Sequence, residues 1–191
     1  MDHLRALVVQ RAARLQERPA LTAPGWGSLS WSAWRSRVEG LGFALLVQTP
    51  LPAAVHAATG TPWDWACEVA AACCGLAWDP AVAAVDSAIL GGAGFHPEAG
   101  RGPYHDREHA LSTSTLFTAA LDHGTVLARL QRLNRILEWD HDTRLRLPLG
   151  SLAQPATRAA LWSLLYAGGH AVLETGTVDW DARPFGGFWT P

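Results

Sequence analysis

Residues 144–174 read RLRLPLGSLAQPATRAALWSLLYAGGHAVLE, and this stretch predicts a strand, a helix and a second strand in succession. Leucines alternate with arginine and proline over the first six positions, which is typical of an edge strand. Pro155 begins a helix that extends to Tyr166, and Gly168-Gly169 ends it, because proline favours the first helical turn and glycine the position after the last one. The apolar run from His170 to Glu174 is then the second strand.

The same alternation of strands and helices continues upstream. Apolar residues recur at helical spacing in several segments, and capping residues such as Ser30 and Thr61-Pro62 mark where helices begin. The predicted helices cover residues 4–15, 31–45, 63–74, 105–121 and 126–138, and the predicted strands cover 20–22, 53–58, 76–78 and 85–90. We therefore expect an α/β fold with a mostly parallel sheet flanked by helices.

The composition suits one domain in water. The chain has 191 residues, of which 49% are hydrophobic and 17% charged, and its formal net charge is −2. We expect a single domain over residues 1–191. The charge balance leaves no basic surface for the phosphates of nucleic acid, and no apolar run reaches the ~20 residues that span a bilayer. Because no leader pattern stands at the N-terminus, we expect a cytoplasmic protein that contacts neither nucleic acid nor membrane.

Two residue types carry further information. All 15 basic residues are arginine, so any mechanism that needs a lysine as phosphate ligand, Schiff base or general base is excluded. The chain also has 10 tryptophans, which we interpret as core packing with a contribution to a subunit interface. Cys67, Cys73 and Cys74 lie together in one apolar segment, which favours buried reduced thiols over a disulfide framework.

A glycine-rich loop is the strongest candidate for a binding site. The segment Gly91–Pro103 contains five glycines and follows the predicted strand 85–90. In α/β folds, ligands bind at loops beyond the carboxyl ends of strands. Backbone amides of such a loop can surround an anion, and Arg101 or Arg107 could add positive charge.

The order of these elements resembles the N-terminal part of the adenylate-forming superfamily, the acyl-CoA synthetases and related ligases that make an acyl-adenylate from ATP. Four segments carry the resemblance. They are Arg18–Leu21, which is similar to the family's "pAL" strand; Ser30–Leu46, similar to its next helix; Thr61–Pro80, similar to a block that ends in G-a-v-x-x-P; and Arg144–Gly169, similar to a "d-r-x-L-x-x-x-P-l" block with the helix after it. The resemblance implies the fold of that family's N-terminal subdomain.

The phosphate-binding loop departs from the family pattern. The family's T-S-G-T-T-G-x-P-K-G motif should stand where this chain has Gly91–Pro103. Gly94 and Gly100 are similar to the two motif glycines, and His109 lies near a downstream Ser-His of the family. The phosphate-binding hydroxyls are replaced by glycine, alanine, phenylalanine and histidine, and the lysine by Gly100 or Pro103.

The chain also lacks the family's adenine-binding loop, its Y-G-x-T-E block, its ribose-binding aspartate and its C-terminal domain with a catalytic lysine. Nothing is left to align the phosphates of ATP, so we expect a truncated, catalytically inactive relative that acts as a binding or assembly protein. We expect no cofactor, with ATP or AMP as the alternative, and self-association as a homodimer or a protein partner that covers apolar surface. In a residual nucleotide- or acyl-binding module, the ligand-binding residues would be Gly92, Gly94, Gly100, Arg101, Arg107 and His109.

Two rival chemistries remain open. Residues 105–109 fit H-x-x-E-H, a zinc-peptidase pattern in which His105 and His109 would bind the metal beside a third ligand. The same residues also suit a solvated helix N-terminus. A dinucleotide site at Gly92-Ala93-Gly94 is the weaker alternative, because the third glycine comes late. We interpret Trp139–Asp142 as a polar turn rather than a metal site.

Overall fold

The computed structural model describes residues 2–92, 107, 111, 115–117 and 121–190. The helices are α1 (Leu4–Leu15), α2 (Trp31–Leu46), α3 (Pro62–Cys74), α4 (Ser87–Gly92), α6 (His123–Leu137) and α7 (Pro155–Ala167), with short 3₁₀ turns at Leu149–Ser151 and Arg183–Phe185. The strands are β1 (Pro19–Ala23), β2 (Gly27–Ser30), β3 (Ala54–Val55), β4 (Ala77–Trp78), β5 (Thr115–Phe117), β6 (Leu121–Asp122), β7 (Arg144–Pro148) and β8 (His170–Glu174).

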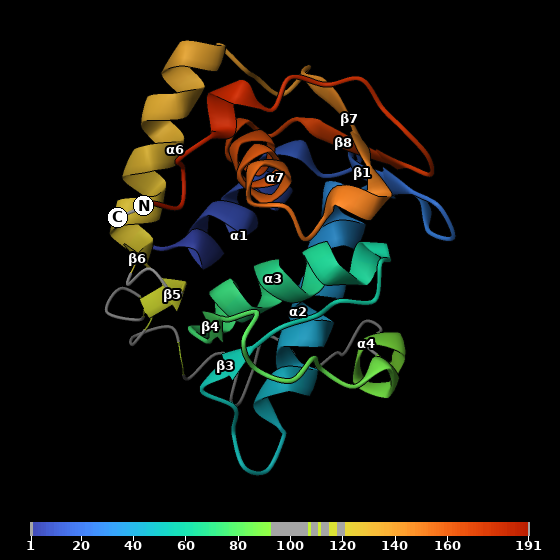
Figure 1. Cartoon of the computed structure of the whole chain (residues 1–191), viewed down its shortest axis with the longest axis vertical. Helices are drawn as coiled ribbons and strands as arrows, with labels where there is room; N and C mark the ends of the chain where they lie inside the picture. The colour runs from blue at the N-terminus through green and yellow to red at the C-terminus, as the bar shows by residue number, and fades with distance from the viewer. Residues whose placement is uncertain (1, 93–106, 108–110, 112–114, 118–120, 191) are drawn as a thin grey trace.

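These strands form two sheets, and the helices pack between and around them (Figure 1). The first has the order β2-β1-β8-β7 and the second the order β3-β4-β5-β6. Each sheet contains two parallel pairs and one antiparallel pair at an edge. The predicted α/β class with mostly parallel pairing is therefore confirmed, although the strands divide between two sheets where the sequence indicated one.

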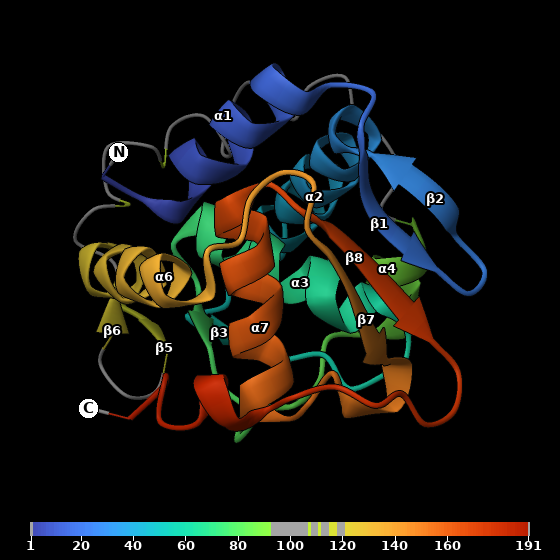
Figure 2. The same cartoon turned by 90° about the horizontal axis from the view of Figure 1, so that it is seen from above.

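The first sheet joins the two ends of the chain. Strand β1 pairs in parallel with β8, and Leu21 lies opposite Ala171 (Figure 2). The predicted strand–helix–strand unit is confirmed as β7, α7 and β8, with β7 at the edge of the sheet. Glycine is required where α7 turns into β8: Gly168 has φ +88, and a Cβ on Gly169 would lie 2.6 Å from the carbonyl oxygen of Thr143.

Local capping explains why several helix boundaries follow from the sequence. The Oγ of Ser30 accepts a hydrogen bond from the backbone N–H of Ala33 at the start of α2. Thr61 caps α3 in the same way, Pro62 occupies its first turn, and Gly75 ends it with φ 67. The predicted starts of these two helices, and the end of α3, are confirmed.

The core is rich in tryptophan. Trp34 and Trp65 are stacked with ring centroids 6.5 Å apart, and Trp162 meets Trp65 edge-on at 5.2 Å. All ten tryptophans belong to the described residues, and each is buried or half-buried. An exposed tryptophan-lined patch, which the self-association hypothesis requires, is therefore not found. Among the described residues, no helix is both long and apolar enough to cross a membrane.

Two predicted elements are wrong. The strand expected at 85–90 is instead the short helix α4, because the Oδ1 of Asp86 accepts a bond from the N–H of Ala88 and starts a helical turn. The helix expected at 105–121 is interrupted by β5, in which Phe117 pairs with Trp78 of β4; the partner strand outweighs the helical spacing. The rest of that segment, apart from Arg107, Leu111 and Leu121, lies outside the described residues.

Two smaller differences concern strand and helix starts. Strand β2 was not predicted, and it forms a hairpin with β1 through the turn at Pro24–Gly27. Helix α6 begins at His123 rather than Val126, because Asp122 caps it by accepting the N–H of Thr125 at 2.7 Å.

Candidate functional site

The structure places two of the predicted binding residues. Gly92 is the last residue of α4. Arg107 is half-buried, and its Nε donates to the carbonyl oxygen of Cys74 at the end of α3, at 2.6 Å. A cation at a helix C-terminus is favourable there. Gly94, Gly100, Arg101 and His109 lie outside the described residues, so this binding site stays a prediction.

The cysteines of α3 are buried free thiols, as predicted. Burial is the main cause that raises the pKa of Cys67 to about 12, and it also raises the pKa of Cys74. A thiol that stays protonated at neutral pH is a poor nucleophile. These cysteines therefore pack the helix and offer no nucleophilic chemistry.

The zinc hypothesis gains no support. Within the described part of the chain, no three histidine, cysteine or acidic residues stand close enough together to hold a metal ion. His105 and His109 lie outside that part.

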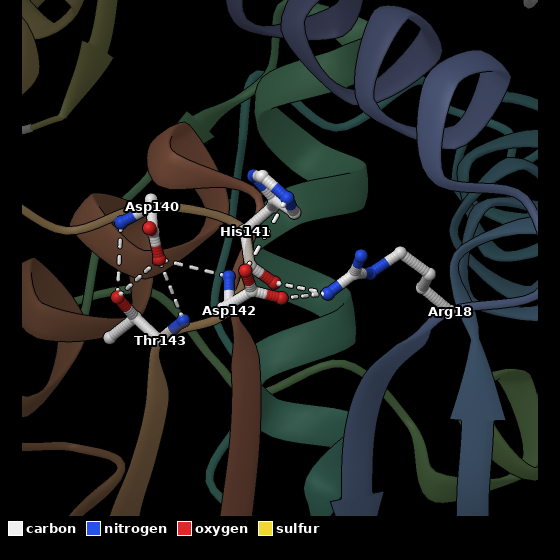
Figure 3. Close-up of polar contacts among 5 residues, drawn as sticks. All are labelled: Arg18, Asp140, His141, Asp142 and Thr143. Carbon is white, nitrogen blue, oxygen red and sulfur yellow. Dashed lines mark hydrogen bonds and ion pairs between the residues drawn. The ribbon is translucent and has the colours of Figure 1, made fainter.

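The segment Trp139–Asp142 forms the polar turn that the sequence predicted (Figure 3). The Oδ1 of Asp140 accepts bonds from the N–H of Asp142 at 2.9 Å and from the N–H of Thr143 at 3.1 Å. These bonds are the main reason why the pKa of Asp140 is lowered. This carboxylate orders the turn between α6 and β7.

A buried ion pair joins α3 to α7. The guanidinium of Arg158 donates to both carboxylate oxygens of Glu68, at 2.6 and 2.9 Å, and the indole N–H of Trp162 donates to Glu68 at 2.8 Å. The sequence analysis missed this pair. A single acid in the otherwise apolar α3 was the available signal, because a buried carboxylate requires a partner.

Aromatic rings surround the cation of this pair. The guanidinium carbon of Arg158 lies 4.9 Å from the ring centre of Trp189, and 5.6 Å from those of Trp78 and Phe117. Trp189 belongs to the C-terminal tail, where its indole N–H donates to the carbonyl of Pro155 at 2.8 Å. The charges are thus paired and covered, which is the arrangement of a structural centre.

A second group of arginines lines an open cavity of about 430 Å³, which we name the arginine pocket. It lies where α1, the turn after α6 and the end of α7 meet. Its lining residues are Arg11, Arg14, Leu15, Arg18, Asn134, Trp139, Asp140, His141 and Ala167. Sequence analysis missed it, because these residues come from three separate segments.

The arginines of the pocket differ in how they are held. Arg11 donates through Nε to the carbonyl oxygen of Tyr166 at 2.8 Å, with a second bond from Nη2. Arg18 pairs with Asp142 and donates to the carbonyl of His141 at 3.3 Å (Figure 3). Arg14 has no hydrogen-bond or ion-pair partner within the described part of the chain. Burial, and secondly the charge of Arg14, lowers the pKa of Arg11.

Comparison with known proteins gives solved structures only. No family model and no curated protein sequence match this chain. The NpsA N-terminal subdomain from Klebsiella oxytoca, in complex with 3-hydroxyanthranilyl-AMSN, has a TM-score of 0.62 and 11% identity over 94% of this chain and 55% of its own. The N-terminal domain of FACL13 from Mycobacterium tuberculosis has a TM-score of 0.59 and 13% identity, over 93% and 58%.

A third match is a protein described as a long-chain-fatty-acid CoA ligase from Rhodopseudomonas palustris, with a TM-score of 0.58 and 17% identity, over 90% of this chain and 57% of that one. This chain has the fold of the N-terminal subdomain of adenylate-forming enzymes.

The resemblance inferred from the order of elements is therefore confirmed for the fold. The adenylate-forming fold extends over both sheets, since more than nine tenths of the chain is covered in the first two matches. The chain spans 55% to 58% of the length of the solved chains it matches. At 11% to 17% identity, the likeness concerns the fold and assigns no role to any residue.

Proposed function

We propose that this chain does not activate carboxylic acids and acts instead by binding a small ligand. The observation that carries the proposal is the absence of lysine from all 191 residues, in a chain with the adenylate-forming fold. The segment Gly91–Pro103 also contains no serine or threonine. Lysine and hydroxyl groups are the side chains that would hold and neutralise the phosphates of ATP.

The described surroundings of this loop support the same conclusion. Arg107 could replace a lysine by charge, but its Nε donates to the end of α3. The thiols of α3 have raised pKa values. The described residues of this region thus offer neither a nucleophile nor a charge aimed at a phosphate.

Adenylation is tested by ATP–pyrophosphate exchange. The acids to use follow from the structural neighbours: 3-hydroxyanthranilate, because the NpsA subdomain was solved with its acyl-AMSN derivative, and a long-chain fatty acid, because another neighbour is described as a fatty-acid ligase. We expect no acid-dependent exchange above a protein-free control, while an active adenylate-forming enzyme assayed in parallel gives a clear signal. Acid-dependent exchange by this chain would overturn the proposal.

Native mass spectrometry tests the remaining alternatives. A homodimer stays a prediction, and the tryptophan surplus no longer supports it, because none of the ten rings is exposed. We expect a spectrum without bound ATP or zinc. A stoichiometric ATP adduct would instead support the residual nucleotide-binding module of residues 91–109, and a stoichiometric zinc would revive the histidine pair 105 and 109.

A further inference from the structure

We propose that the arginine pocket binds a small phosphate ester with free hydroxyl groups, its phosphate against the arginines and its hydroxyls against Asn134 and Asp140. The assignment rests on the proposed binding role and names its site and ligand class. It uses residues outside the glycine-rich loop, and the pocket lies on a different part of the fold.

One wall of the pocket is cationic. Arg11, Arg14 and Arg18 follow one another at spacings of three and four residues, which brings them to the same side of α1 and the turn after it. Their guanidinium groups have a planar arrangement of donors that fits phosphate oxygens. Arg11 and Arg18 are each anchored by one or two of their donors, so the others remain available.

The positive charge of this wall exceeds what the protein itself neutralises. Three guanidinium groups stand against two carboxylates, Asp140 in the lining and Asp142 on Arg18. Arg14 accounts for the excess, and its charge acts unfavourably on Arg11. A dianionic phosphate between these side chains would relieve that repulsion.

Helix C-termini do not account for Arg14. Helices α1, α6 and α7 all end near the pocket, and cations there can stabilise the last carbonyl groups. These carbonyls already have partners, however. The N–H groups of Gly168, Glu138 and Gln16 bond back into α7, α6 and α1 respectively, and Arg11 takes the carbonyl of Tyr166.

The opposite wall offers hydrogen-bond acceptors. The amide of Asn134 is held by a bond from its Nδ2 to the carbonyl of Trp139 at 3.1 Å, and its Oδ1 is buried without a donor. A buried acceptor without a partner is costly, and a ligand hydroxyl would satisfy it. Asp140 uses only Oδ1 to order its turn. A cavity of about 430 Å³ falls within the range of small-molecule sites.

Isothermal titration of the purified chain, at constant ionic strength, tests the assignment with three probes: glucose 6-phosphate, inorganic phosphate and glucose. We expect saturable one-to-one binding of glucose 6-phosphate, at least about ten-fold weaker binding of inorganic phosphate, and none of glucose. Arg14→Ala should weaken the binding of glucose 6-phosphate at least about ten-fold. Arg135→Ala is the matched control, because Arg135 is an exposed arginine of α6 outside the pocket lining.

Three outcomes would overturn the proposal: no saturable binding of glucose 6-phosphate, an unchanged affinity in Arg14→Ala, or an equal loss in Arg135→Ala. Equal affinity for inorganic phosphate and glucose 6-phosphate would overturn the hydroxyl-binding wall. Because titration needs no turnover, a failed titration together with absent pyrophosphate exchange refutes this site alone. Acid-dependent exchange refutes the proposed function, whatever the pocket binds.

Discussion

Arg158 and Arg14 are the same residue in opposite surroundings. Arg158 lies between α3 and α7 with its charge paired to Glu68, and three aromatic rings surround it. Arg14 stands at the edge of an open cavity without a partner in the described part of the chain. The comparison separates two uses of arginine: a paired and covered guanidinium holds the fold together, and an unpaired one at a cavity is available to a ligand.

The difference also appears in what each region can lose. The side chains of Arg158 and Glu68 are only 11% and 2% exposed, so removal of one leaves the other charged and cut off from water. The pair of Arg18 and Asp142 beside the pocket is 47% and 68% exposed, and water can replace either partner. We expect substitutions around Arg158 to change stability and those in the arginine pocket to change binding.

The largest effect should follow from breaking the buried pair. Arg158→Met is expected to lower the free energy of unfolding by about 3–5 kcal/mol, because Glu68 would keep only its bond to Trp162. Urea denaturation measures the loss. The double variant Glu68→Met with Arg158→Met is the control, and it should be more stable than the single variant because no charge stays buried alone. A loss below about 1 kcal/mol in Arg158→Met would contradict the structural role.

A second buried group should make stability depend on pH. His123 is fully buried, and mainly through burial its pKa falls from 6.5 to about 4. Its Nδ1 accepts the N–H of Leu4 at 3.0 Å, so protonation at that atom would break the bond that begins α1. Above pH 6.5 both the folded and the unfolded chain hold this histidine neutral. Between pH 6.5 and 4 only the unfolded chain takes up the proton, so stability falls with pH.

The expected loss for His123 is up to about 3 kcal/mol between pH 7.5 and pH 4, measured by urea denaturation across that range. His123→Asn removes the titration and keeps an acceptor near Leu4, so its stability should depend less on pH. His141→Gln, at an exposed position of the polar turn, is the matched control and should keep the dependence of the parent chain. An identical pH profile in His123→Asn would show that other groups cause the loss.

The contrast between the regions also explains how far sequence reasoning reached. The starts of α2, α3 and α7 could be predicted because Ser30, Thr61-Pro62 and Pro155 act on their own neighbours in the chain. The segment 85–90 misled because a single Asp86 side chain started a helix in a run too short for its pattern to decide. Strand β5 could not be foreseen, since pairing with β4 places it there.

The sites were harder to predict than the elements. Glu68 is 90 residues from Arg158, and the arginine pocket combines residues of α1, α6 and α7, so no local pattern announces either. The glycine loop was visible because its residues are consecutive. Motif reasoning therefore favours sites made of neighbours in sequence, and sites assembled by packing become visible only in the fold.

A substitution at the junction of the two regions should have an intermediate effect. A Cβ on Gly169 would lie 2.5 Å from Leu164 and 2.6 Å from the backbone of Thr143, just behind the polar turn. Gly169→Ala should therefore cost about 1–3 kcal/mol of stability, because α7 and the turn must separate. Gly150→Ala is the matched control, since its Cβ would meet nothing within 4 Å. Thermal unfolding of both variants measures the difference, and equal stability would contradict the close approach.

The smallest effect is expected where an ion pair is visible but exposed. Arg18→Ala removes the contact with Asp142, yet it should cost less than about 1 kcal/mol, because water solvates the remaining carboxylate. The decisive measurement is its ratio to Arg158→Met in the same urea titration. A loss at Arg18 comparable to that at Arg158 would mean that the pocket arginines hold the fold together, and the division between structural and ligand-binding arginines would fail. A small loss would leave the three pocket arginines as side chains whose charge the fold does not need.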